Sequence, residues 1–167
     1  GKILVGGSFE TLAGQSIKNL GRLNTNGSPD SAFNPKADSY VDSLVVQPDG
    51  KILLAGVYSL GGQPRQGLGR INGDGTLDST FNPGLDSSPS SLALQADGKI
   101  VIGGNFYTVN GQVRNGLARL NADGTLDLTF NPGRDGYDIC LTLQPDGKIL
   151  VGGRFELLVT GRGKRPE

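Results

Sequence analysis

The sequence predicts an all-β protein built from β-propeller blades, and three observations support this fold class. First, a phrase marked by Gly-Lys recurs every 48 or 49 residues. Second, each copy alternates short apolar runs with tight turns, and no segment has a helical period. Third, a fixed step of this length is typical of propellers and other arrays of stacked units. The Gly residues that mark the step are Gly1, Gly50, Gly98 and Gly147.

One copy, residues 90–132, shows how the strands are predicted. Residues 91–95 alternate between apolar and small side chains, as in a strand with one buried face. Residues 99–109 are apolar on both faces at their centre, which favours a central strand covered on both sides. The four antiparallel strands expected in each repeat of about 49 residues are, in this copy, residues 91–95, 99–109, 115–121 and 125–130.

Glycine and asparagine mark the points where the chain changes direction. Asp97-Gly98 and Asn110-Gly111 are pairs that favour tight turns, because glycine adopts positive φ and Asp or Asn bonds its own backbone. The pair Gly103-Gly104 lies inside a predicted strand. It therefore predicts a bulge, a bend or close backbone packing there.

The chain opens at the start of a second strand and spans about 3.4 repeats. We expect propeller repeats over residues 1–155, divided as 1–46, 47–94 and 95–143, with the start of a fourth at 144–155. Residues 156–167 depart from the pattern and form a basic tail, which we interpret as a solvated terminus.

Composition excludes several classes of function. Sixteen basic residues balance sixteen acidic ones, so nothing favours nucleic acid as a partner. No apolar run has the length of a membrane span. The absence of His excludes histidine-based acid–base chemistry, and the single cysteine excludes thiolate zinc sites. We expect no cofactor.

Three motifs recur in a fixed order: the Asp-Gly-Lys turn, a Gly-Gly-x-Phe strand end such as residues 103–106, and a close of the form Leu-Asp…Phe-Asn-Pro. This combination resembles the delta-60 repeat, a tandem bacterial repeat. The resemblance implies a β-propeller in long, often surface-associated or secreted proteins, and it implies no activity. A β-trefoil is the alternative for four-stranded repeats of this length, and the Gly-Gly bend and the resemblance argue against it.

The acidic turns raise the question of calcium. Oxygen-bearing residues at alternate positions before a glycine resemble the start of a calcium loop, but the bidentate Glu at the twelfth position is missing. A hairpin with an Asx bond explains these turns without metal. The weak calcium candidates that remain are Asp74, Asp78, Asp123 and Asp127.

An arginine precedes an aspartate by eight residues in three repeats, on segments joined by a short turn. We expect cross-strand ion pairs that stabilise each repeat. A ring of arginines that binds an anion is the alternative, and the strict coupling to Asp favours the structural pair. The pairs are Arg22 with Asp30, Arg70 with Asp78, and Arg119 with Asp127.

Catalysis by paired carboxylates is the remaining route to an enzyme. An active site breaks internal symmetry, so the candidates are carboxylates outside the repeat pattern. Nothing in the sequence brings two of them together, and we expect no enzymatic activity. These residues are Glu10, Asp42, Asp135, Asp138 and Glu156.

Aromatic residues give few candidates for ligand binding, because Trp is absent. Phe9, Phe106 and Phe155 end apolar strands and are expected in the core between blades. Tyr40, Tyr107 and Tyr137 lie outside the pattern and are candidates for surface contacts.

These observations predict a non-enzymatic structural or interaction module that displays variable loops on a repeated frame, as part of a bacterial surface or secreted protein. A ligand- or calcium-binding lectin-like propeller is the alternative, and a carboxylate-based hydrolase comes after it. Because open sheet edges invite association, we expect a homodimer that closes a ring of about seven blades, or further repeats of one longer chain. Protein or glycan ligands and an extracellular location are expected.

Overall fold

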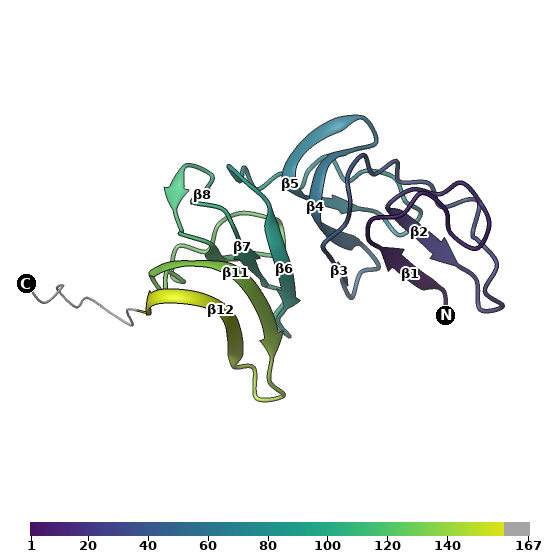
Figure 1. Cartoon of the computed structure of the whole chain (residues 1–167). Helices are drawn as coiled ribbons and strands as arrows, with labels where there is room; N and C mark the ends of the chain where they lie inside the picture. Colours follow the sequence, from purple (N-terminus) through teal and green to yellow (C-terminus); the bar gives the residue numbers. More distant parts are fainter. Residues whose placement is uncertain (159–167) are drawn as a thin grey trace, which may run out of the picture. The chain divides into compact units, whose positions relative to one another are not determined.

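The computed structural model describes the backbone of residues 1–158 and the side chains of residues 1–133 and 139–154. The chain divides into two compact units, Gly1–Asn82 and Pro83–Glu167. Every regular element in the described part is a β-strand, and all strand pairs are antiparallel. The all-β prediction is confirmed (Figure 1).

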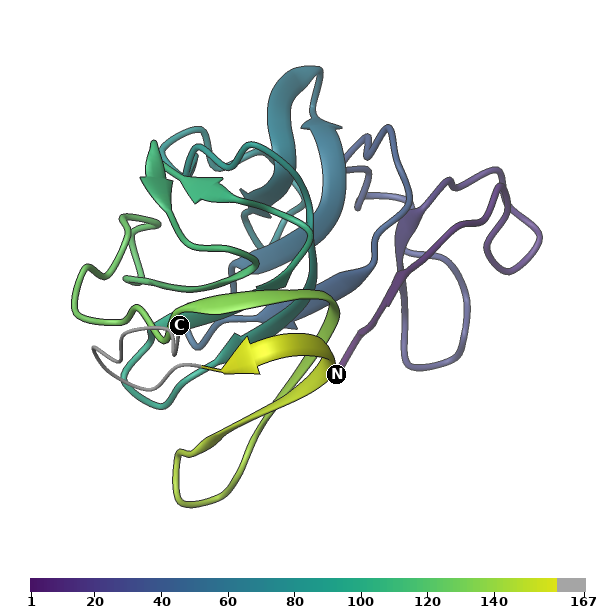
Figure 2. The ribbon, with the colours of Figure 1, turned by 60° about the vertical axis from the view of Figure 1, so that its left-hand side comes forward.

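The first unit contains a two-stranded and a three-stranded sheet. In the three-stranded sheet the long strand β4 is central, and the β4–β5 hairpin extends well beyond β3 (Figure 2). The strands are β1 (Ile3–Gly6) and β2 (Leu20–Leu23), then β3 (Ser43–Val46), β4 (Ile52–Leu60) and β5 (Gln63–Ile71).

The second unit repeats this plan with a three-stranded sheet in which β7 is central, followed by a long two-stranded sheet, β11 with β12. A small hairpin, β8 with β9, lies between β7 and β10 along the chain. The strands are β6 (Pro89–Leu94), β7 (Ile100–Gly104), β8 (Thr108–Val109), β9 (Gln112–Val113), β10 (Leu117–Leu120), β11 (Arg134–Leu143) and β12 (Ile149–Leu158).

The central strands carry the core of each unit. The side chains of residues 52–55 in β4 and 100–102 in β7 are buried on both faces, as the apolar runs predict. In the first unit, Leu20 and Phe33 pack with β4 in one apolar cluster. In the second unit, Ile139 of β11 packs with Val101 of β7 in another. Burial of apolar surface therefore holds successive repeats together within each unit.

Two-residue turns with positive φ at both positions close the hairpins that follow the central strands, as in type I′ turns. Asn110-Gly111 is confirmed as one of them, and the other two were not singled out by sequence. The three turns are Ala13-Gly14, Gly61-Gly62 and Asn110-Gly111, with φ of 46° and 78°, 56° and 81°, and 48° and 72°.

The pair Gly103-Gly104 coincides with a bulge and close packing, as expected, and Ala55-Gly56 coincides with a bulge at the equivalent place in the second repeat. The β4–β5 register shifts between Ala55 and Val57, and the β6–β7 register shifts between Pro89 and Ser91 beside Gly104. Backbone approaches closely here, because a methyl group on Gly104 would lie 2.5 Å from the Ser90 nitrogen. No side chain fits in this space without a shift of the backbone.

The prediction of a fourth strand in each repeat is wrong. Residues 125–130 contribute one bridge, between Leu120 and Leu126. The chain then turns, because the backbone N–H and the hydroxyl of Thr129 donate to Oδ1 of Asp127, and the N–H of Phe130 donates to the Asp127 carbonyl. The corresponding bridges in the first unit join Leu23 with Pro29 and Ile71 with Leu77.

Two strand boundaries also differ from the prediction. The strand expected over residues 99–109 is interrupted after Gly104, and its last part becomes β8 in a separate hairpin. The repeat expected to stop at residue 155 continues to Leu158, because β12 pairs with β11 as far as the Arg134–Leu158 pair. The rest of the predicted basic tail, residues 159–167, lies outside the described residues.

We predict that Gly103→Ala destabilises the protein by about 1–3 kcal/mol, as overpacking of a filled core does. A methyl group at this position would lie 2.6 Å from Cγ2 of Ile139. Gly7→Ala is the control, because its methyl group would lie 3.7 Å from Phe9, an ordinary contact. Urea unfolding of both variants measures the difference, and equal midpoints would contradict the close-packing account.

Candidate functional site

The repeat motifs converge on one buried carboxylate in each of three repeats. In the second repeat, Nε of Arg70 lies 2.9 Å from Oδ2 of Asp78, and Nζ of Lys51 lies 2.8 Å from the same oxygen. The arginine belongs to β5, and the lysine follows the Asp-Gly turn that leads into β4. The Asp side chain is 6% exposed. The carboxylate therefore ties two strands and a turn together.

The same geometry recurs in the other two repeats. Oδ2 of Asp127 lies 2.9 Å from Nε of Arg119 and 2.9 Å from Nζ of Lys99. Oδ2 of Asp30 lies 2.7 Å from Nε of Arg22 and 2.6 Å from Nζ of Lys2. The ion pairs expected between residues eight apart are present, and a lysine joins each of them.

The second carboxylate oxygen has hydrogen-bond donors of its own. Oδ1 of Asp78 accepts the backbone N–H of Thr80 at 3.1 Å and its hydroxyl at 2.6 Å. Thr129 makes the same two bonds to Asp127, at 2.9 and 2.6 Å. The first repeat has Ala32 at this position, which has no hydroxyl to offer.

A phenylalanine completes each group by packing against the arginine. The guanidinium carbon of Arg70 lies 4.4 Å from the centre of the Phe81 ring, within the range of a cation–π contact. Arg22 over Phe33 and Arg119 over Phe130 give 4.3 and 4.6 Å. We call each set of Lys, Arg, Asp and Phe a carboxylate cluster. The members are Lys2, Arg22, Asp30 and Phe33; Lys51, Arg70, Asp78 and Phe81; and Lys99, Arg119, Asp127 and Phe130.

The clusters keep their carboxylates ionised. Burial raises the pKa of Asp78, but hydrogen bonds from Lys51, Thr80 and Arg70 outweigh it and hold the pKa well below its ordinary value of 3.8. Bonds from Thr129 and Lys99 lower the pKa of Asp127 in the same way.

The calcium interpretation loses support from this geometry. Both oxygens of Asp78 and of Asp127 have partners, and the cationic ones repel a metal ion. Oδ1 of Asp74 and of Asp123 accepts bonds from the threonine two residues later, which is the expected Asx turn. Among the described residues, no three acidic or cysteine side chains gather as a metal site would require.

A second carboxylate recurs five residues after each phenylalanine of the Phe-Asn-Pro motif. Oδ1 of Asp38 accepts the N–H of Ser59 at 2.8 Å, and Oδ1 of Asp86 accepts the N–H groups of Tyr107 and Thr108, both at 3.0 Å. Asp135 occupies the same position in the third repeat, so its assignment as a residue outside the pattern is wrong. Its side chain is not among those described.

The remaining catalytic candidates do not assemble in the described part of the chain. Glu10 forms an exposed ion pair with Lys18 at 2.5 Å. Burial raises the pKa of Asp42. The side chains of Asp138 and Glu156, and those of Tyr137 and Phe155, lie outside the described residues.

The predictions for the aromatic residues are confirmed only in part. Phe106 is buried as expected, whereas Phe9 is half-buried. Tyr58 occupies the equivalent strand position in the second repeat but is exposed, because the bulge turns Val57 into the core instead. Tyr40 and Tyr107 are exposed. They remain candidates for surface contacts.

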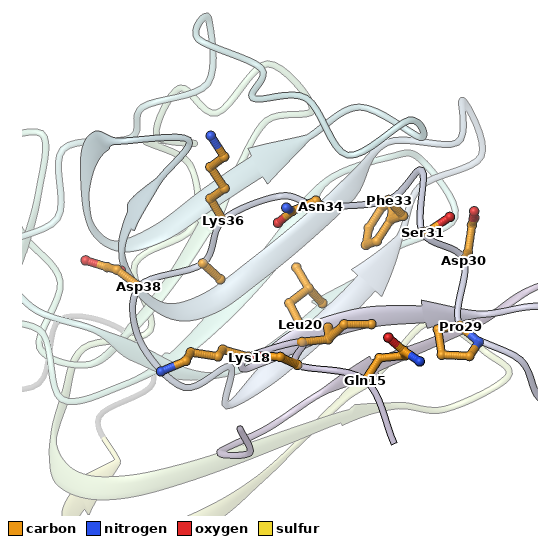
Figure 3. Close-up of a pocket in the computed structure, with 13 residues that line it drawn as sticks. Gln15, Lys18, Leu20, Pro29, Asp30, Ser31, Phe33, Asn34, Lys36 and Asp38 are labelled. Atoms are coloured by element: carbon orange, nitrogen blue, oxygen red, sulfur yellow. The ribbon is translucent and has the colours of Figure 1, made fainter. Parts of the chain in front are cut away.

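A cavity of about 830 Å³ lies in the first unit (Figure 3). Leu20 and Phe33 point into it, whereas the amine of Lys36 points away from both. Lys36 has a φ of 51°, a conformation that the equivalent Gly84 and Gly133 adopt without strain. The lining residues are Gln15, Ser16, Ile17, Lys18, Leu20, Pro29, Asp30, Ser31, Phe33, Asn34, Lys36, Ala37 and Asp38.

One substitution distinguishes this part of the first repeat from the others. Ile17 stands three residues before Leu20, where the later repeats have Arg65 and Arg114. Both arginines are buried, and the Nε atom of each has no hydrogen-bond partner among the described residues. The cavity in the first repeat therefore has an aliphatic wall at the position that a guanidinium group fills elsewhere.

A known family matches this repeat structure. The profile of a β-propeller domain of unknown function, DUF5122, matches residues 1–33, 47–81, 95–130 and 144–161. The first three matched segments end at Phe33, Phe81 and Phe130, and each contains one complete carboxylate cluster. The chain belongs to this family. The fold of the DUF5122 chain is thus a β-propeller repeat, and the trefoil alternative is set aside.

Searches of curated proteins and of solved structures found no significant match to the DUF5122 chain. Among the described residues, no helix is long and apolar enough to span a membrane.

The lysines are the cluster members that sequence reasoning missed. Each lies 27 or 28 residues before its aspartate, too far for a local pairing rule. One feature of the sequence could have identified them, because Lys2, Lys51 and Lys99 recur at the same interval along the chain as the arginine–aspartate pairs.

We predict that Asp78→Asn destabilises the DUF5122 chain by about 2 kcal/mol, because it leaves Lys51 and Arg70 without a buried counter-charge. Asp49→Asn is the control. Asp49 is exposed and only accepts the Lys51 N–H, at 3.1 Å, so the cost is about 0.5 kcal/mol or less. Urea unfolding at pH 7 checks both, and equal losses would contradict a structural role of the cluster.

Stability is predicted to fall with pH below about 4. The pKa values of Asp30, Asp78 and Asp127 are lowered in the folded chain, whereas the unfolded chain takes up protons near pH 3.9. The contribution is therefore complete above the unfolded pKa and is lost as pH falls toward the folded values. Urea unfolding at pH 7, 4 and 2.5 measures the slope, and Asp78→Asn should make it shallower. A variant slope equal to that of the unchanged chain would contradict the assignment.

Proposed function

We propose that this DUF5122 chain is a non-enzymatic structural and interaction module. The observation that carries the proposal is the use of its buried charges. In three repeats the buried carboxylate is held between a lysine and an arginine, so its charge joins segments of the repeat. A carboxylate kept ionised by two cations is poorly suited to deliver a proton near neutral pH.

Contacts with ligands are proposed for the loops between the strands. The exposed loop residues Tyr40 and Tyr107 lie outside the carboxylate clusters, and the cavity of the first repeat lies at the edge of one of them. Such positions vary without loss of the frame, because the cluster residues and the central strands stabilise each repeat. A protein or a glycan is the proposed class of ligand.

The proposed partner of the chain is a second copy of itself, or further repeats of one longer chain. In support, the sheets β1–β2 and β11–β12 have only two strands in the described part, whereas the sheets around β4 and β7 have three, so β1 and β12 each have an open backbone edge. The likeness to delta-60 repeats supports a place in a bacterial surface or secreted protein.

Light scattering on a sizing column tests the partner directly. We expect a mass of twice the 17.4 kDa of one chain, with a monomer fraction that grows on dilution. A monomer at every protein concentration up to about ten times the Kd of a micromolar complex would contradict self-association.

A further inference from the structure

Four strands of the described residues 1–158 follow a Gly-Lys pair, namely β1, β4, β7 and β12, and two of these four have an open edge. Strands β4 and β7 are paired on both sides, by β3 and β5 and by β6 and β10. Strand β1 is paired only with β2, and β12 is paired only with β11. By position in the repeat, β1 lacks the strand that precedes it, and β12 lacks the strand that follows it. The two sheets are therefore complementary parts of one three-stranded sheet.

Strands β1 and β12 share one stretch of sequence. Residues 1–7 and residues 147–153 both read GKILVGG, so β1 and the first half of β12 present the same side chains at the same spacing. Whatever site accepts one segment has the shape and chemistry to accept the other.

The two copies of this segment differ in the burial of their leucine and in the ion pair of their lysine. In β1, Leu4 packs against the core cluster of the first unit, and Nζ of Lys2 lies 2.6 Å from Asp30. In β12, the equivalent Leu150 is 49% exposed. Lys148 reaches only Asp146 in its own turn, at 2.6 Å, in an ion pair exposed to solvent. The β12 copy thus lacks the carboxylate cluster that its sequence fits.

We propose that β12 of one copy replaces β1 of a second copy, so that β11, β12 and the partner's β2 form one three-stranded sheet. This exchange rests on the proposed self-association and specifies its interface. The register of β1 on β2 places Ile149 opposite Leu23 of the partner subunit. It also brings Lys148 to Asp30 of the partner subunit, in the place of that subunit's own lysine.

The exchange has a favourable energy balance because the sequence is repeated. The contacts that the partner loses on release of its residues 1–7 are replaced by contacts of the same side chains from residues 147–153. In addition, β11 covers an edge that β1 leaves open, and Leu150 moves into an apolar site. Exchange of an identical element between protomers is a low-cost route to a dimer.

The exchange also changes the expected number of blades. Because β12 and β1 become alternatives in one blade, each copy contributes three blades rather than about 3.4. A reciprocal dimer then holds six blades, within the range of about four to eight that propellers adopt, whereas three copies would hold nine. On this proposal the expected ring has six blades, where the sequence predicts about seven.

A matched pair of lysine variants tests the proposal. Lys148→Ala should weaken the dimer about tenfold, because it removes a charged hydrogen bond made only in the exchanged form. Lys2→Ala should leave the dimer unchanged or tighten it, because the exchanged form does not use that side chain. Analytical ultracentrifugation of both variants over a concentration series measures the dissociation constants.

A disulfide trap provides the second readout. In a Cys140→Ser background, Ile149→Cys with Leu23→Cys should give a covalent dimer on oxidation. Ile3→Cys with Leu23→Cys is the control and should give an intrachain bond at low protein concentration, since β1 pairs these residues directly. A dimer by mass that neither forms the 23–149 bond nor distinguishes the two lysine variants overturns the exchange but leaves self-association standing. A monomer at every concentration overturns both.

Discussion

One buried carboxylate joins the segments of each of three repeats. The Asp of the cluster accepts bonds from the turn that enters the central strand, from the strand that follows, and from the turn that leaves the repeat. The carboxylate thus links three segments whose apolar residues, such as Ile52 and Ile71, also pack in the core cluster of this unit. The same interaction explains why the expected fourth strand is a turn. Oδ1 of Asp78 holds the backbone of Thr80, and the ladder ends there.

Differences among the repeats show which parts of this arrangement are separable. The first repeat keeps the lysine, the arginine and the phenylalanine but has Ala32 in place of threonine. It also has Ile17 where a buried arginine stands in the others, and Lys36 where they have glycine. All three changes lie at or near the cavity. The first repeat is therefore the place where the frame is least constrained by the pattern and most open to a specific contact.

The charged residues and the open strand edges have different roles. Charges buried in the clusters join segments of single repeats, and the ion pairs keep the carboxylates ionised. The open edges of β1 and β12 are instead the basis of the proposed association, because unpaired backbone groups at a sheet edge can pair with another strand. Since one strand sequence occurs at both edges, the repetition that builds the frame within a chain also suits contacts between chains.

The sequence by itself determined the repeat step, the all-β class and the pairing of Arg70 with Asp78, because these follow from local periodicity and short separations. The tertiary structure decided which lysine joins each pair, because that contact spans 27 or 28 residues. It also decided that Asp38 and Asp86 hold the backbone of the following repeat, and that Tyr58 is exposed while Phe106 is buried. These outcomes depend on long-range packing and on bulge positions, which no local pattern encodes.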